Sequence, residues 1–299
     1  MKKTGNSILN KAKYSNNTDE WYTDYKTIEK EVIHYESQFN GKKILCNCDD
    51  PYESAFAKYF LKNFNKLKLK KLVCISYSKS VMHTNKDDNG LILVVENMPN
   101  ELNNISSDKA ISKYLQKSGI VYKLKGDGDF RSEECLEYLV DSDIIVTNPP
   151  FSKFRDFLTW IIESKKQFLI IGNLNSISYK EVFRLIRNNI LWLGPSIISG
   201  DREFEVPVDV VDLSKFTGQI RDGKYFQRVV GVRWFTNLDH GRRHQAIPLM
   251  TEKDVIKFST KKPYDKYDNY DAIEVSYVKQ IPSDYDGVMG VPISFLDKH

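Results

Sequence analysis

The chain has 299 residues, 41% of them hydrophobic, and a formal net charge of +4. This length supports a sizeable core in one large domain or two smaller ones, and the small charge surplus neither requires nor excludes a nucleic-acid partner. The N-terminus carries lysines without an apolar segment, and no run approaches about 18 consecutive apolar residues, so a secretory signal and a membrane span are excluded.

The cysteines do not form a metal-binding pattern. The spacing Cys46-x-Cys48 is too tight for the usual CxxC metal knuckle, and no histidine cluster follows it. Cys46 and Cys74 lie in apolar runs, where a free thiol packs as a small hydrophobic group. We therefore predict free cysteines, no metal site and a reduced cytoplasmic protein.

Residues 1–19 are polar and lack periodicity, so we predict a flexible N-terminal arm. Beyond this arm, short apolar runs of strand length alternate with segments whose apolar residues recur at helical spacing. The predicted strands are 43–48, 72–75, 91–95, 121–124, 144–147 and 168–172. The predicted helices are 25–39, 54–64, 134–139, 154–164 and 180–187.

Helices that alternate with continuously apolar strands are typical of a parallel sheet covered on both faces. We therefore predict an α/β protein with a doubly wound, mostly parallel sheet. The strand at 91–95 follows a loop-like segment, and we interpret it as an excursion in hairpin form.

The pattern changes after about residue 195. Strand-like pieces at 229–235 and 272–278 alternate with turn signals, and tyrosines and charged residues crowd together. We predict a main domain at 20–195 and a smaller, irregular region of mixed or mainly β character at 196–299.

Three predicted strands end in polar or acidic segments, which begin at Asp49, at Gly126 and at Asn148. Ligands of parallel α/β sheets bind at the carboxyl ends of the strands. We therefore expect these three segments to converge on one edge of the sheet.

The most informative segment is the motif Asn148-Pro149-Pro150-Phe151. The two prolines make the chain leave the strand along a fixed path, and this path directs the Asn148 side chain and the Pro149 carbonyl to one point. Two such acceptors suit an exocyclic amino group, because they stabilise the positive charge that develops on nitrogen during methyl transfer. Phe151 is expected to stack on a flipped base. The alternative is a strand-ending turn without chemistry.

The motif and the order of the segments resemble the S-adenosylmethionine-dependent amino-methyltransferases. The chain is still more similar to the EcoRI-like adenine-specific DNA methyltransferases, through residues 19–23, 126–131, 148–151, 267–273 and 286–292. This resemblance covers most of the chain. It implies a Rossmann-like methyltransferase sheet, S-adenosylmethionine as cofactor, double-stranded DNA as partner and a target-recognition role for 196–299.

The resemblance also implies which residues bind the cofactor, through a Tyr-Thr element, an Asp-Pro loop, an acid–aromatic pair and the catalytic motif. These residues are Tyr22, Thr23, Asp49, Asp50, Pro51, Ser54, Asp129, Phe130 and Asn148. The chain departs from the family in two places. No glycine lies between Asp50 and Phe60, and Ser54 stands where one is expected. The second strand has no acid at its tip, which leaves Ser76, Tyr77 or a residue elsewhere as alternatives for the ribose contact.

Structural interpretations stand beside these roles. Tyr22 and Thr23 can lead into a helix that Thr23 or Asp24 caps, and the acids at 49–50 can complement a helix dipole. Asp129 can be a turn residue that precedes a core aromatic.

A basic segment at 221–244 indicates contacts to DNA phosphates or to guanine in the major groove. A solvated surface is the alternative. The predicted DNA-binding residues are Arg221, Lys224, Arg228, Arg242 and Arg243.

The predicted function is transfer of a methyl group from S-adenosylmethionine to the N6 amino group of a flipped adenine in a specific duplex DNA sequence. The alternatives are an RNA adenine or protein glutamine methyltransferase, and a non-catalytic nucleic-acid-binding protein with a degenerate cofactor fold. The setting is bacterial, or a phage or mobile element. A cognate restriction endonuclease would be a partner within the system, without need of physical contact.

Overall fold

The computed structural model describes residues 23–80, 88–98, 107–198, 202–206, 218–260 and 263–297. The predicted N-terminal arm and Tyr22 lie outside the described residues. The chain divides into two compact units, residues 1–238 and residues 239–299.

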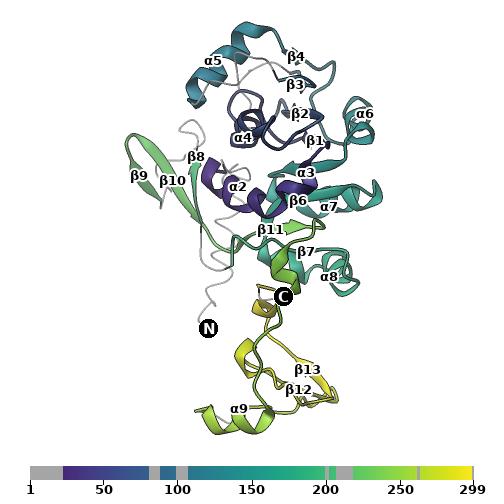
Figure 1. The fold of residues 1–299 in the computed structure, drawn as a ribbon, viewed down its shortest axis with the longest axis vertical. Helices are drawn as coiled ribbons and strands as arrows, with labels where there is room; N and C mark the ends of the chain where they lie inside the picture. The colour runs from purple at the N-terminus through teal and green to yellow at the C-terminus, as the bar shows by residue number, and fades with distance from the viewer. Residues whose placement is uncertain are drawn as a thin grey trace, which may run out of the picture. The chain divides into compact units, whose positions relative to one another are not determined.

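An eight-stranded sheet forms the centre of the first unit, in the order β4-β3-β2-β1-β5-β6-β11-β7 (Figure 1). The strands are β1 (Lys43–Cys46), β2 (Lys71–Ile75), β3 (Leu91–Val95), β4 (Val121–Lys123), β5 (Ile144–Thr147), β6 (Gln167–Asn173), β7 (Trp192–Leu193) and β11 (Val232–Thr236). The central strands β2, β1, β5 and β6 pair in parallel. Only β3 and β11 run against their neighbours in this sheet, which confirms the mostly parallel α/β prediction.

Helices and short 3-10 turns connect these strands. The helices of the first unit are α2 (Tyr25–Val32), α3 (Glu36–Phe39), α4 (Ala55–Asn63), α5 (Asp108–Ser118), α6 (Glu133–Asp141), α7 (Phe154–Glu163) and α8 (Lys180–Arg187). The 3-10 turns are η1 (Ile33–Tyr35), η3 (Phe151–Lys153) and η4 (Leu174–Ser178). The predicted helix at 25–39 is therefore divided, because η1 interrupts it.

Both faces of the sheet are covered, with α2 and α4 on one side and α6 and α7 on the other (Figure 1). Cys46 of β1 and Val146 of β5 join the buried cluster that contains the apolar residues of α2 and α4. On the other face, Phe154 of α7 packs against Phe235 and covers Gly172, where an added Cβ would lie 2.3 Å from the Phe154 ring. The sheet is thus doubly wound, as predicted.

Helix α5 is absent from the predicted elements, although its local signals are present. Ser107 precedes the helix, Ile111 and Leu115 form its buried face, and Gly119 ends it with φ of +69°. A left-handed glycine is a common helix terminator. The predicted excursion at 91–95 is confirmed as β3, which pairs antiparallel with β2.

The compact units divide later in the chain than the predicted boundary at residue 195. Strand β11 covers part of the predicted strand 229–235 and pairs with β6 and β7 in the main sheet, because Trp234 and Phe235 bury their side chains there. A three-stranded antiparallel sheet also belongs to the first unit. Its strands are β8 (Arg202–Val206), β10 (Lys224–Val229) and β9 (Gln219–Arg221).

The second unit is small and irregular. It contains α9 (Glu252–Phe258), the parallel pair β12 (Ala272–Glu274) and β13 (Val288–Gly290), and the 3-10 turns η6 (Gly241–His244), η7 (Val278–Gln280) and η8 (Ile293–Asp297). The predicted strand at 272–278 ends at Glu274. A small buried cluster of Ile273, Val275 and Ile281 holds the unit together.

Across both units, no helix of the described ranges is long and apolar enough to cross a membrane. The four cysteines are free, and Cys46, Cys74 and Cys135 are buried, as predicted for thiols in a core.

The buried Glu31 joins α2 to the segment after β7. Its Oε1 accepts a hydrogen bond from the Tyr35 hydroxyl at 2.7 Å, and its Oε2 accepts one from the Ser196 backbone N–H at 2.9 Å. Burial raises the pKa of Glu31 from its ordinary value of 4.5 to about 7, although both hydrogen bonds lower it. The folded chain therefore holds a proton at pH values where the unfolded chain has released it. The contribution of Glu31 to stability falls as pH rises from 4.5 to about 7.

The substitution Glu31→Gln should flatten the dependence of the unfolding free energy on pH, because the neutral amide does not titrate. The unfolding free energy of the variant, relative to that of the unmodified chain, should therefore increase as pH rises from about 5 to about 7. Urea unfolding at intervals across this range measures the slope. The buried Asp49 titrates in the same direction and stays in the variant, so part of the slope should persist. Parallel curves for the two proteins would contradict the assignment.

Candidate active site

The topology of the sheet marks one point as a ligand site. The connection from β1 passes through α4 to β2 on one side, whereas β5 connects through α7 to β6 on the other side. The chain therefore leaves β1 and β5 in opposite directions. Ligands of open α/β sheets bind outside the carboxyl ends of the strands at such a switch point.

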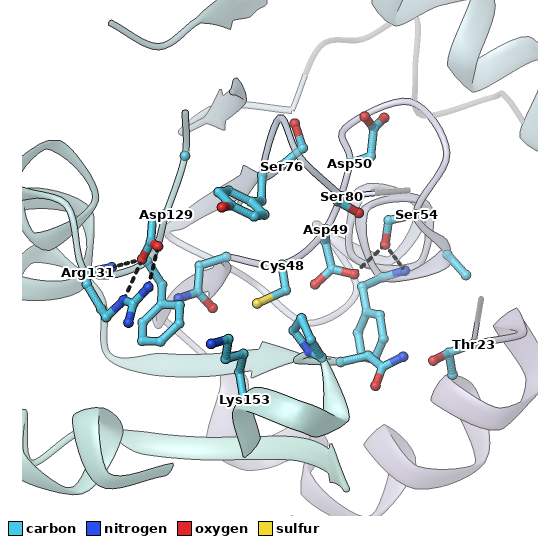
Figure 2. Close-up of a pocket in the computed structure, with 18 residues that line it drawn as sticks. Thr23, Cys48, Asp49, Asp50, Ser54, Ser76, Ser80, Asp129, Arg131 and Lys153 are labelled. Atoms are coloured by element: carbon cyan, nitrogen blue, oxygen red, sulfur yellow. Dashed lines mark hydrogen bonds and ion pairs between the residues drawn. The ribbon is translucent and has the colours of Figure 1, made fainter. Parts of the chain in front are cut away.

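A pocket lies at these strand ends, and many of the predicted site residues line it (Figure 2). The predicted residues in its wall are Thr23, Asp49, Asp50, Ser54, Asp129, Phe130, Asn148 and Pro150. The three polar segments thus meet at one place, as expected.

Three of the described residues that are predicted for catalysis or cofactor binding do not line this pocket. Pro149 is buried, and Pro51 is buried in the turn before α4. Phe151 is partly buried and packs against the main hydrophobic cluster. The stacking of Phe151 on a flipped base stays a prediction.

The turn after β1 is built without glycine because side chains close it. The Asp50 carboxylate accepts hydrogen bonds from the backbone N–H groups of Tyr52 at 2.9 Å and Glu53 at 3.2 Å. Ser54 then caps α4, since its hydroxyl accepts from the Phe56 N–H at 3.0 Å. These bonds hold the turn in place of the backbone freedom that glycine gives.

Asp49 is buried between this turn and the end of β5. Its Oδ1 accepts from the Ser54 hydroxyl at 2.6 Å, and its Oδ2 accepts from the Thr147 hydroxyl at 2.5 Å. Burial raises the pKa of Asp49 to about 7, whereas the two hydrogen bonds lower it and the neighbouring Asp50 raises it. The carboxylate is therefore satisfied from two different elements.

The loop at 126–130 reaches the pocket because two glycines allow a close approach to Ser76. A Cβ at Gly128, whose φ is +81°, would lie 2.2 Å from the Ser76 carbonyl oxygen. A Cβ at Gly90 would lie 2.6 Å from the same atom. The tip of β2 and the Asp129-Phe130 pair are thereby held in one wall. Ser76 and Tyr77, the two alternatives for a ribose contact, also line the pocket.

Asp129 and Phe130 each have an internal partner. The Asp129 carboxylate accepts from Arg131 Nε at 2.9 Å and from Arg131 Nη2 at 2.7 Å, and these hydrogen bonds hold the pKa of Asp129 below its usual value (Figure 2). The Phe130 ring packs against Phe157 and Trp160, with ring centroids 5.0 and 5.1 Å apart. Phe130 therefore belongs both to an aromatic cluster and to the pocket wall.

Asn47 is a site residue that the sequence analysis does not predict. It follows β1 directly and is only 2% exposed, and neither amide atom has a hydrogen-bond partner in the described part of the chain. The hydroxyl of Thr23, which lines the same pocket, is buried without a partner as well. An unsatisfied buried polar group costs about 1–3 kcal/mol, so both groups indicate a ligand that supplies the missing bonds. The position of Asn47 at the end of a buried strand was the available signal.

No cluster of three or more potential metal ligands occurs within the described ranges. The remaining side chains of the pocket include the thiol of Cys48 and the amino group of Lys153 (Figure 2).

The predicted DNA-binding residues fall into two groups. Arg221 and Lys224 are cross-strand partners in the β9–β10 hairpin, and Arg228 lies on the same face as Lys224 because side chains alternate along a strand. The Arg221 guanidinium lies 4.3 Å from the centre of the Phe226 ring, and Lys224 pairs with Glu205 at 2.8 Å.

Arg242 and Arg243 belong to the second unit, where Arg243 pairs with Asp239 at 3.2 Å. Between the two groups, Arg233 is buried and donates to the backbone carbonyls of Val232 and Ile198. The basic segment at 221–244 therefore includes one arginine that is buried. The DNA contacts stay predictions.

The sequence also matches known proteins. The family described as adenine-specific methyltransferase EcoRI matches residues 8–299. The chain is 42% identical to the Type II methyltransferase M.EcoRI of Escherichia coli, over 98% of this chain and 86% of that protein. It is 38% identical to the Type II methyltransferase M.MgeORF184P of Mycoplasma genitalium, over 97% and 82% of the two chains. It is 37% identical to the Type II methyltransferase M.MpnI of Mycoplasma pneumoniae, over 97% and 81%. No solved structure matches the chain.

Substitution of Gly128 tests the close approach that forms the pocket wall. Gly119→Ala is the matched control, because its φ of +69° imposes similar strain while no atom lies within 4 Å of the added Cβ. The control should lose about 1 kcal/mol of stability. Gly128→Ala should lose clearly more, since its Cβ would collide with the Ser76 carbonyl. Thermal unfolding of both variants measures the difference, and equal losses would refute the contact.

Proposed function

The chain belongs to the EcoRI family of adenine-specific methyltransferases and is an adenine-specific DNA methyltransferase, and we propose that its methyl donor is S-adenosylmethionine. The acceptor we propose is the N6 amino group of an adenine that is flipped out of a specific duplex DNA sequence. One observation supports both parts. Asn148 lines the same switch-point pocket as the unsatisfied polar groups of Asn47 and Thr23.

The donor side of the pocket fits the polar and aromatic groups of this cofactor. When bound, S-adenosylmethionine supplies a methyl group on a positively charged sulfonium. The Asn47 amide offers its NH₂ group as a donor and its carbonyl oxygen as an acceptor, and neither has a partner among the described residues. Phe130 offers an aromatic surface for the adenine ring, and Asp129 keeps a lone pair on Oδ2 beyond the three hydrogen bonds that it accepts from Arg131.

The acceptor side depends on Asn148. The exocyclic nitrogen of adenine gains positive charge as the methyl group arrives. We propose that the Asn148 amide oxygen and the Pro149 carbonyl each accept a hydrogen bond from one N–H of that nitrogen. These bonds would stabilise the developing charge. S-adenosylmethionine bound in the pocket would supply the methyl group, so much of the rate would come from how Asn148 and the pocket wall position the acceptor nitrogen.

For DNA recognition, we propose that the β9–β10 hairpin contacts the duplex through Arg221, Lys224 and Arg228. A two-stranded ribbon fits the major groove, and the shared face of these cations suits phosphates or base edges. Arg242 and Arg243 are proposed to add contacts from the second unit. The three relatives are Type II methyltransferases, which supports a place in restriction-modification beside a cognate endonuclease.

The alternative functions are weaker in view of the family. An adenine-specific DNA methyltransferase family does not favour glutamine in a protein or adenine in RNA as the acceptor. The missing glycines of the turn after β1 are the feature that favours a non-catalytic binding protein, and the bonds of Asp50 and Ser54 account for their absence.

We expect Asn148→Ala to lower kcat by about 100-fold or more, because it removes an acceptor that acts on the developing charge. Binding of S-adenosylhomocysteine, measured by calorimetry, should change little. Transfer of labelled methyl groups to DNA from a methylation-deficient strain measures the rate. Asn148→Asp is the control, since it keeps an acceptor of the same shape and should retain part of the activity. Full activity in the alanine variant would overturn the proposed mechanism.

We expect Asn47→Ala to weaken the binding of S-adenosylhomocysteine by about 10-fold or more, because the amide would lose bonds that only the ligand supplies. Folding stability should not fall, since the amide has no partner within the described protein. Asn89→Ala is the control: this amide donates to the carbonyls of Leu124 and Lys125 outside the pocket wall. A loss of stability without a loss of affinity would assign Asn47 to the fold instead.

A further inference from the structure

We propose that Thr147 and Asp49 form a buried link that positions the catalytic Asn148 relative to the turn after β1 (residues 47–54), here called the cofactor turn. In this role, which rests on the proposed function, both are positioning residues for methyl transfer.

The link lies where backbone pairing between β1 and β5 has stopped. Those two strands pair at Ile44 with Ile144 and at Leu45 with Ile145. On the other side of β5, pairing with β6 continues to Thr147. Backbone pairing therefore holds the last residue of β5 to β6. Its connection to the segment after β1 must come from its side chain.

The Thr147 hydroxyl supplies that missing connection. It donates to Asp49 Oδ2 at 2.5 Å and accepts from the backbone N–H of Cys48 at 3.2 Å. Both functions of the hydroxyl are thus used. Both of its partners belong to the turn that follows β1.

Asp49 extends the connection to the start of α4 and to β2. Its other carboxylate oxygen accepts from the Ser54 hydroxyl at 2.6 Å, and Ser54 in turn accepts from the Phe56 N–H. The Asp49 backbone N–H donates to the Ile75 carbonyl at 2.8 Å. One carboxylate therefore connects β5, the turn and the N-terminus of α4, while its own backbone is fixed to β2.

The environment makes this connection stiff and costly to break. Thr147 is fully buried and Asp49 is 4% exposed, so water cannot replace a lost partner. Hydrogen bonds from Ser54 and Thr147 favour the charged carboxylate against its burial. Burial nevertheless raises the pKa of Asp49 to about 7, so these bonds have their full, charge-assisted strength only above that pH.

The sequence after Thr147 transmits this constraint to the reacting group. Asn148 follows directly, and the two prolines that come next fix the onward path of the chain. Rotation at Thr147 would therefore move the Asn148 amide as a whole. Because Asp49 holds the cofactor turn at the same time, the donor side and the acceptor side keep a fixed separation.

The hydroxyl of Thr147 can be tested by a matched pair of variants. Thr147→Val keeps the branched shape and removes the hydroxyl, whereas Thr147→Ser keeps the hydroxyl and removes the methyl group. We expect Thr147→Val to lower kcat by about 10- to 100-fold, which is the effect of a small misplacement of reacting groups. The KM for DNA and the affinity for S-adenosylhomocysteine should stay within about 3-fold, because contacts to neither ligand are removed. Thr147→Ser should restore kcat to near that of the unmodified enzyme.

A different set of outcomes would overturn the proposal. Full kcat in Thr147→Val would show that the hydroxyl is dispensable, and a Thr147→Ser variant as slow as Thr147→Val would assign the effect to packing. Should Thr147→Val fail to fold by circular dichroism, the comparison passes to Thr147→Ala and Thr147→Ser, which differ only in the hydroxyl. Equal rates in that second pair would also refute the link.

Failure of the proposed function would look different. In that case the unmodified chain would transfer no methyl group to DNA at all, whereas a refuted link leaves the unmodified enzyme active.

Discussion

The separation of β1 from β5 is the constraint on which the site depends. Parallel strands satisfy their backbone groups by pairing, so a sheet that opens between two central strands must satisfy polar groups in another way. Here side chains supply the hydrogen bonds beyond the last backbone pair of the two strands. Thr147 bonds to Asp49, and Asp49 bonds to Ser54. Asp50 and Ser54 also accept hydrogen bonds from backbone N–H groups of the turn and of α4. The opening that results is the pocket, and its wall retains polar groups of Asn47 and Thr23 that no protein atom in the described ranges satisfies.

Much of this arrangement could be predicted because it is local in the sequence. Continuous apolar runs such as Ile144–Val146 indicate buried parallel strands, and the prolines after Asn148 mark the end of one of them. The rule that ligands bind at the carboxyl ends of strands then brings Asp49, Asp129 and Asn148 together, and all three line one pocket. Periodicity also indicates most helices, although α5 was missed where a short amphipathic stretch follows an irregular segment.

What could not be predicted depends on tertiary partners. Nothing local indicates that β11 pairs with β6. A strand with two buried faces has the same apolar pattern whether it belongs to the main sheet or to a small separate sheet. Burial of Arg233 is a similar case, because a charged side chain suggests a surface position, whereas the carbonyls of Val232 and Ile198 accept hydrogen bonds from its guanidinium inside the protein. The empty hydrogen-bonding capacity of Asn47 also becomes visible only when its surroundings are known.

The turn after β1 contains no glycine, so a ligand has less backbone motion to restrict when it binds there. A glycine-rich loop has a large conformational entropy in the unfolded and unliganded chain, and part of that freedom is lost on binding. The bonds of Asp50 and Ser54 remove this freedom when the protein folds rather than when a ligand arrives. A preorganised turn of this kind has little backbone mobility, and its binding surface has its final shape before the ligand arrives.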